Sequence, residues 1–88
     1  MEKLFERMEV EKLNYAVALN WYEEFKKATF KLQEMRDDNI IRSDNSWVGR
    51  DADRCYEDLN GFLWGLYTTG YISAELREEY TDQLLAMF

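Results

Sequence analysis

Residues 1–40 read MEKLFERMEVEKLNYAVALNWYEEFKKATFKLQEMRDDNI, and this stretch contains neither proline nor glycine. Because these two residues are the strongest helix breakers, nothing in the stretch interrupts a helix. One set of apolar residues recurs at spacings of three, four or seven, as on one face of a helix. The set comprises Val10, Leu13, Val17, Trp21, Ala28, Leu32 and Met35. The pattern predicts one long helix over residues 2–38 with this face packed inward.

The second half of the chain predicts two shorter helices. Asp51 is a suitable N-cap for a helix over residues 51–68, and Gly70 can adopt the left-handed conformation that ends it. Ser73 is a suitable N-cap for a helix over residues 74–87. The short link between the two would make them an antiparallel hairpin. The expected fold is therefore all-α, a small single-domain bundle in which the long N-terminal helix packs on a C-terminal helical hairpin.

The long helix has a second apolar face, which the hairpin cannot cover. A helix over residues 2–38 would extend about 50 Å, roughly twice the length of the hairpin. The side opposite the first face carries Leu4, Met8, Tyr15, Leu19 and Tyr22. Since a solitary helix does not leave two apolar faces in water, two alternatives stay open. Either the chain bends near residues 8–11 and folds a short helix back, or this face binds another chain, in a homodimer or with a different partner.

The charge of the chain favours protein partners over nucleic acid. There are 18 acidic and 11 basic residues and a formal charge of −7. Nucleic-acid binding needs clustered Lys and Arg, so direct binding of DNA or RNA is not expected. An acidic chain is instead attracted to basic surfaces of other proteins. The sequence shows neither a secretion signal nor a membrane span, and its one cysteine fits the reducing cytoplasm.

The side chains required for common catalytic and cofactor sites are missing. The chain has no histidine, so Cys55 and the hydroxyl residues have no imidazole to activate them. Residues 44–49 superficially resemble the start of a calcium loop, but Val48 and Cys55 stand where that loop needs oxygen ligands. We therefore expect neither an enzyme nor a metal or cofactor site.

Two tryptophans have both a structural and a functional interpretation. Trp64 lies between Gly61 and Gly65, away from the apolar side of its helix. Either another helix of the chain packs into the glycine notch and Trp64 completes the core, or the three residues form a docking surface. Trp47 is expected in a loop, where it either caps the end of the bundle or anchors a partner.

The carboxylates of residues 37–58 form the main candidate for an electrostatic contact. They are Asp37, Asp38, Asp44, Asp51, Asp53, Glu57 and Asp58. One interpretation is a solvated rim with local ion pairs to the interleaved arginines. The other is an acidic ridge that occupies a basic site on a partner, with Trp47 or Trp64 as its anchor.

In its size, acidity, aromatic content and lack of histidine, the whole chain resembles the small inhibitors encoded by phages and mobile elements, such as the anti-CRISPR proteins. The resemblance rests on no motif and carries over no functional residue. It implies a stoichiometric inhibitor of a bacterial defence nuclease, such as a CRISPR effector, that blocks nucleic-acid loading or a conformational step. The alternative function is a self-associating helical adaptor in a larger assembly.

Overall fold

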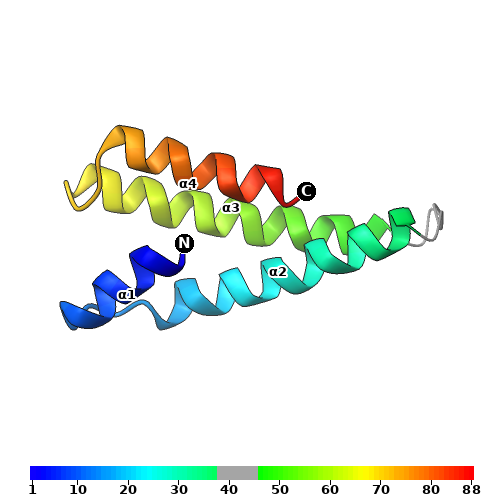
Figure 1. The fold of residues 1–88 in the computed structure, drawn as a ribbon, viewed down its shortest axis with the longest axis horizontal. Coiled ribbons are helices and arrows are strands. Elements are labelled where there is room, and N and C mark those ends of the chain that lie inside the picture. Colours follow the sequence, from blue (N-terminus) through cyan, green and yellow to red (C-terminus); the bar gives the residue numbers. More distant parts are fainter. Residues whose placement is uncertain (38–45) are drawn as a thin grey trace.

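The computed structural model describes residues 1–37 and 46–88, with side chains for residues 1–35 and 49–88. These residues form four α-helices and no strand, so the predicted all-α class is confirmed (Figure 1). The helices are α1 (Glu2–Val10), α2 (Ala16–Asp37), α3 (Ser46–Thr68) and α4 (Ala74–Ala86).

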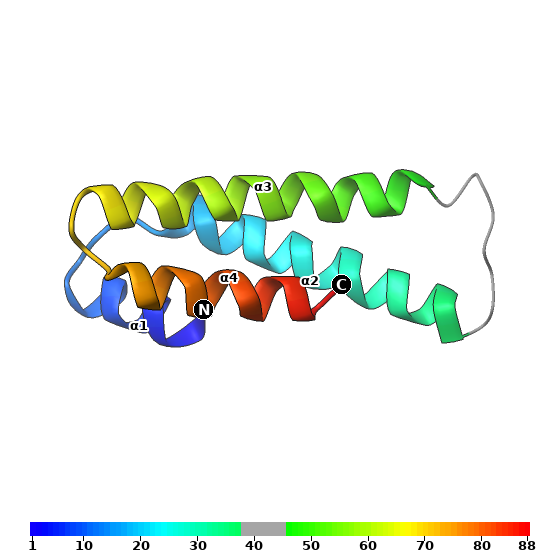
Figure 2. The same cartoon turned by 90° about the horizontal axis from the view of Figure 1, so that it is seen from above.

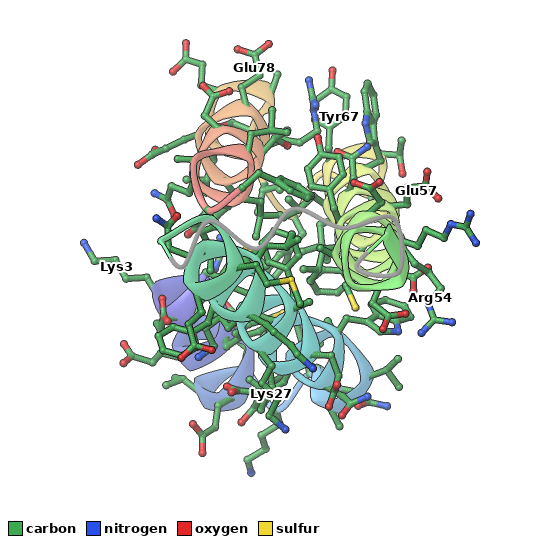
Figure 3. All side chains as sticks on the ribbon, turned by 90° about the vertical axis from the view of Figure 1, so that its right-hand side faces the viewer. Lys3, Lys27, Arg54, Glu57, Tyr67 and Glu78 are labelled. Carbon is green, nitrogen blue, oxygen red and sulfur yellow. The ribbon has the colours of Figure 1, made fainter. Side chains whose placement is uncertain are left out.

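Helices α2 and α3 are antiparallel and form the long axis of the bundle (Figures 1 and 2). Helix α4 returns along α3, and α1 lies beside the first part of α2. Both short helices lie toward the end of the α2–α3 pair where α3 ends and α4 begins. In the view along the long axis, charged side chains such as Lys3, Lys27 and Glu57 project away from the bundle (Figure 3).

The single helix predicted over residues 2–38 is wrong, because α1 ends at Val10 and α2 begins at Ala16. Lys12 adopts a left-handed conformation, with φ of 59°. The Lys12 amide donates a hydrogen bond to the Glu9 carbonyl at 3.0 Å, and the Leu13 amide donates one to the Met8 carbonyl at 2.8 Å. This pair of bonds is the Schellman motif, which usually has glycine at the left-handed position. The chain therefore bends after α1, which agrees with the alternative in which a short N-terminal helix folds back.

The start of α2 is stabilised by a side-chain hydrogen bond. The Asn14 side-chain oxygen accepts a hydrogen bond from the Ala16 amide at 3.2 Å. The first regular bond of the new helix follows, from the Leu19 amide to the Tyr15 carbonyl at 2.8 Å. Asn14 thus satisfies one of the amides that a helix start leaves without a partner.

Because of the bend, the two apolar faces of residues 2–38 exchange their expected roles in the core. Leu4 and Met8 of α1 are buried together with Tyr22 and Phe25 of α2. Predicted contact residues Val10 and Val17 are instead exposed. Of the rest of that set, Leu13 is exposed, and the partly buried members are Trp21, Ala28, Leu32 and Met35.

The face expected to join a second chain lies inside this one. Leu4, Met8 and Tyr22 belong to the core, and Tyr15 and Leu19 are partly buried against it. The Phe5 ring stacks on Tyr15, with 5.8 Å between the ring centroids. These residues therefore do not form an open self-association surface, and that prediction is corrected.

The hairpin of α3 and α4 follows the predicted pattern closely. The inward side of α3 contains Ala52, Leu59 and Leu63, none of which exposes any surface. Gly70 has a φ of 81° and ends α3, and the Ser73 hydroxyl accepts a hydrogen bond from the Leu76 amide at 3.1 Å. Both predictions about the ends of these helices are confirmed. The N-cap predicted at Asp51 is wrong, because α3 begins at Ser46 and Asp51 lies within it.

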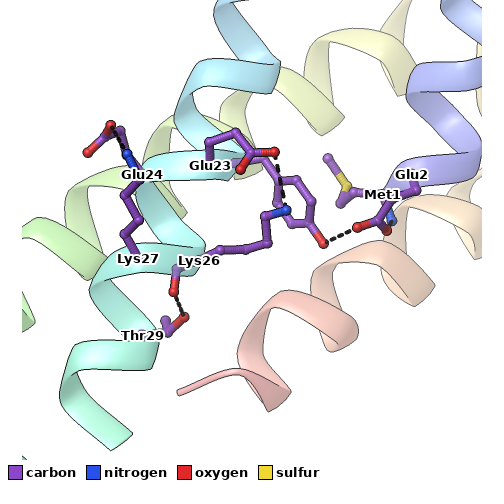
Figure 4. Close-up of polar contacts among 8 residues, drawn as sticks. Met1, Glu2, Glu23, Glu24, Lys26, Lys27 and Thr29 are labelled. Carbon is purple, nitrogen blue, oxygen red and sulfur yellow. Dashed lines mark hydrogen bonds and ion pairs between the residues drawn. The ribbon is translucent and has the colours of Figure 1, made fainter. Parts of the chain in front are cut away.

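Polar contacts fix α1 at both of its ends. Arg7 lies 4.0 Å from the centre of the Tyr71 ring and donates a hydrogen bond to the Tyr71 carbonyl at 3.2 Å. The Tyr71 hydroxyl donates to the Glu11 carboxylate at 2.6 Å. At the other end, the Tyr22 hydroxyl donates to Glu2 at 3.1 Å, and Glu2 points from α1 toward α2 (Figure 4). These contacts join α1 to α2 and to the link between α3 and α4.

We predict that Lys12→Gly stabilises the chain. A left-handed non-glycine residue costs roughly 1–2 kcal/mol, and the greater backbone entropy of glycine offsets roughly 0.5–1 kcal/mol of that cost. The free energy of unfolding should rise by about 0.5–1 kcal/mol in urea denaturation. The control is Glu9→Gly, which should lower it because this residue lies within α1. Equal losses in the two variants would contradict the turn.

We also predict an alkaline loss of stability that depends on Tyr22. Burial and the nearby Glu2 carboxylate raise the pKa of Tyr22 to about 12. The unfolded phenol has a pKa of about 10, so between these values the folded state holds a proton that the unfolded state has lost. The stabilisation of the folded state by protonated Tyr22 is complete below about pH 10 and is lost as pH rises toward about 12. Urea denaturation from pH 9 to 12 should show a flatter pH dependence for Tyr22→Phe, and parallel profiles would count against this assignment.

Candidate protein-binding surface

Two exposed rings of α3 and a largely buried guanidinium of α4 form a cluster, here called the Trp64 cluster: Trp64, Tyr67 and Arg77. Trp64 is 45% exposed and Tyr67 is 38% exposed. Their rings meet edge to face, with 5.8 Å between the centroids. The Arg77 guanidinium lies 4.0 Å from the centre of the Trp64 ring and 5.6 Å from that of Tyr67. Figure 3 shows Tyr67 on the side of α3 that adjoins α4.

The fold holds the Trp64 cluster in place before any partner binds. Gly70 and Ser73 fix the turn between α3 and α4, and Arg77 lies in the first part of α4. The Arg77 side chain is 14% exposed and pairs with Glu78 at 3.8 Å. A cation–π contact of this kind contributes about 0.5–1 kcal/mol at an exposed site. Trp, Tyr and Arg are also the residues enriched at binding hot spots, so the cluster has the composition of an anchor.

The glycines beside Trp64 do not receive another helix of the chain. Gly61 and Gly65 are exposed, and a Cβ atom built on either would meet nothing within 4 Å. Trp64 is also exposed and does not complete the core. The intramolecular interpretation of the glycine notch is therefore wrong.

The predicted acidic ridge divides between two sides of α3. Asp53 and Glu57 are exposed and lie eleven and seven residues before Trp64, which places all three on one side of the helix. Among the described residues, neither carboxylate forms an ion pair. Asp51 and Asp58 are half-buried and seven residues apart on another side, and Asp51 pairs with Arg54 at 3.8 Å. Only Asp53 and Glu57 thus share the side of Trp64.

Four predicted residues remain without a described side chain. Asp37 ends α2, whereas Asp38 and Asp44 lie outside the described residues. Trp47 belongs to the first turn of α3, so the loop predicted for it is wrong. Its side chain also lies outside the described set.

Sequence reasoning missed the outer side of α4. This helix exposes four carboxylates at spacings of three, four and seven residues. They are Glu75, Glu78, Glu79 and Asp82. Residues 61–88 contain these four acids and a single basic residue, Arg77, which is a signal visible in the sequence. In the structure, the Arg77 guanidinium lies against the rings of Trp64 and Tyr67. Its positive charge therefore lies between the outer side of α3 and the outer side of α4.

Cys55 lies on the inward side of α3 and is buried. Burial raises the pKa of its thiol, which disfavours the thiolate that would act as a nucleophile.

Among the described residues, no group of three or more Cys, Asp or Glu side chains is placed to bind a metal ion. None of the helices there combines the length and the hydropathy that a membrane span requires. The chain matches no protein-family model, no curated protein and no solved structure.

We predict that Trp64 and Arg77 are energetically coupled. A double-mutant cycle with Trp64→Ala and Arg77→Ala, measured by urea denaturation, should give a coupling free energy of about 0.5–1 kcal/mol. The control cycle pairs Trp64→Ala with Glu75→Ala, whose effects should add within about 0.3 kcal/mol. A coupling near zero in the first cycle would show that the contact does not hold the cluster together.

Proposed function

We propose that this chain is a non-enzymatic protein-binding module, and that it binds a basic site on a partner through the Trp64 cluster with Asp53 and Glu57. The observation that carries the proposal is the exposure of Trp64 while Arg77 fixes its ring at 4.0 Å. A large aromatic side chain held rigid at the surface loses little conformational entropy on binding, which is a property of hot-spot residues.

The charge of the surface supports the choice of a basic partner. Asp53 and Glu57 extend the Trp64 side of α3, and α4 adds a second row of exposed carboxylates. With a net charge of −7, the chain is attracted over long range to a cationic surface, and this raises the rate of association. Cationic clefts that bind nucleic acid are the surfaces most complementary to such a ligand.

The specific target class that we propose is a nucleic-acid-binding nuclease of a bacterial defence system, such as a CRISPR effector. Carboxylates seated in its basic cleft would take the place of phosphates and exclude the nucleic acid. Inhibition would then be stoichiometric and would weaken as salt concentration rises. The inhibitor itself would need no contact with DNA or RNA.

A self-associating adaptor is the second candidate, supported by exposed apolar residues near the bend. Val10 is 81% exposed, and Leu13 and Val17 are also exposed. This surface differs from the one that the sequence predicted for self-association. Light scattering over a concentration series separates the candidates, because Val10→Glu/Val17→Glu should abolish any dimer that uses this surface.

We predict that Trp64→Ala weakens binding to a purified CRISPR effector nuclease by at least about tenfold, as expected for a hot-spot residue. Asp53→Lys/Glu57→Lys should also weaken binding and should reduce its dependence on salt. The measurement is calorimetric titration at two salt concentrations, together with inhibition of DNA cleavage.

The matched control is Glu24→Lys, which reverses an exposed charge on α2, away from the Trp64 cluster. It changes net charge by the same amount per site, and it should change affinity by less than about threefold because it alters only the long-range field. If Glu24→Lys and Glu57→Lys weakened binding equally, the location of the surface would be wrong. Unchanged affinity for Trp64→Ala would reject the proposed anchor.

A further inference from the structure

The connection between α1 and α2 contains a left-handed residue that is not glycine. Residues 11–15 form this connection, and Lys12 has a φ of 59°. The other described residue with a positive φ is Gly70, which has no Cβ atom to oppose that conformation. For lysine, the left-handed conformation is less favourable than the right-handed conformation of a helix. The turn after α1 therefore opposes the backbone preference of its own residue.

The same connection can form a helix. Residues 2–37 contain neither proline nor glycine, so α1, the connection and α2 can join in one continuous helix. Opening the turn breaks the hydrogen bonds that Lys12 and Leu13 donate and the one that Asn14 accepts. A continuous helix replaces them with regular bonds between each amide and the carbonyl four residues earlier. Residues 11–15 thus have two backbone states, a closed turn and a helical turn.

The open state leaves the packing surface of α1 without cover in a single chain. Leu4, Phe5 and Met8 are buried in the closed state, in one core cluster with Tyr22 and Ile72. In one chain with a continuous helix, the side chains of α1 leave the body of the bundle and enter water, which is unfavourable. The open state therefore needs a second chain that covers α1.

A second copy of this chain supplies that cover, because its own α1 leaves the same site open. Each α1 then packs on the α2 of the other copy and makes the contacts that it makes in the closed chain. These include the hydrogen bonds that Tyr22 donates to Glu2 and Tyr71 donates to Glu11. Such a reciprocal exchange of an identical element is a low-cost route to a closed two-fold dimer.

The charges near the connection do not oppose this dimer. The whole chain has a charge of −7, which disfavours contact between arbitrary surfaces of two copies. Residues 7–15, which the exchange brings close to the two-fold axis, contain two basic and two acidic residues. They are Arg7, Lys12, Glu9 and Glu11. The new contact between the copies is therefore locally neutral.

We propose that the chain dimerises by exchanging α1, with residues 2–37 of each copy in one helix. The proposal goes beyond the function proposed for the Trp64 cluster, which lies on α3 and α4 and is present in each copy of the dimer. Because α1 must leave its site before it can exchange, folded chains keep their own α1. The dimer forms when unfolded chains fold together at high concentration.

The first test is refolding from urea at low and at high chain concentration, followed by size-exclusion chromatography with light scattering. The wild type should give monomer at low concentration and a growing dimer fraction at high concentration. Lys12→Gly should lower the ratio of dimer to monomer at least about tenfold, because glycine favours the closed turn and disfavours the continuous helix. Asn14→Ala should raise that ratio at least about threefold, because it removes a hydrogen bond of the closed state and favours a helix.

The second test identifies the chain that supplies α1 in the dimer. An equal mixture of labelled and unlabelled chains is unfolded, refolded together, and separated into dimer and monomer. Isotope-filtered NMR of the dimer should show nuclear Overhauser effects between the Phe5 and Tyr22 rings of different chains. The monomer fraction of the same sample should lack them.

Val10→Glu/Val17→Glu is the matched control, because both side chains are exposed and lie outside the packing surface of α1. This variant should keep the exchanged dimer, and its loss would assign the dimer to the exposed apolar residues and overturn the exchange. A wild type that stays monomeric at every concentration would also overturn it, as would an unchanged ratio for Lys12→Gly. Phe5–Tyr22 contacts confined to single chains of the dimer would do the same. Binding through the Trp64 cluster is measured separately with Trp64→Ala, so either proposal can fail without the other.

Discussion

Two backbone hydrogen bonds close the turn around Lys12, and the reversal of the chain at this turn determines where α1 packs. The reversal places Leu4 and Met8 of α1 over the side of α2 that carries Tyr22 and Phe25. A continuous helix would have left one of its two apolar faces in water. By folding nine residues back as α1, the chain buries the face of Leu4, Met8 and Tyr22 within itself. Arg7, Tyr71 and Glu2 then supply polar contacts that keep α1 in this position.

The same arrangement leaves one side of α3 free. The inward side of this helix is fully used, since Ala52, Leu59 and Leu63 expose no surface. Helix α4 packs along another side, and its Arg77 reaches across to hold Trp64. What remains is a strip with the exposed Trp64 ring and two open glycines. The proposed binding surface is thus a consequence of how few helices surround α3 in a chain of 88 residues.

Whether a helix end can be predicted from the sequence depends on which residue occupies the left-handed position there. The ends of α1 and α3 use the same hydrogen-bonding pattern, but one has Lys12 at the left-handed position and the other has Gly70. Glycine is the residue that most often adopts this conformation, so the end of α3 can be predicted from Gly70. Lysine does not, and the helix over residues 2–38 was predicted in error. The error propagated to the core, because Val10 and Val17 were placed inside on the assumption of a continuous helix. Exposure of Trp64 could not be derived either, since it depends on which neighbours pack against α3.

Helix α1 folds back on α2 within a single chain. An isotope-filtered NMR experiment on an equal mixture of labelled and unlabelled protein tests it directly. The Phe5 and Tyr22 rings, whose centroids lie 5.8 Å apart, should give nuclear Overhauser effects in the uniformly labelled sample. The intermolecular spectrum of the mixture should lack these signals. If the Phe5–Tyr22 contacts appeared between labelled and unlabelled chains, α1 would belong to a partner chain, and the account of a core closed within one chain would be contradicted.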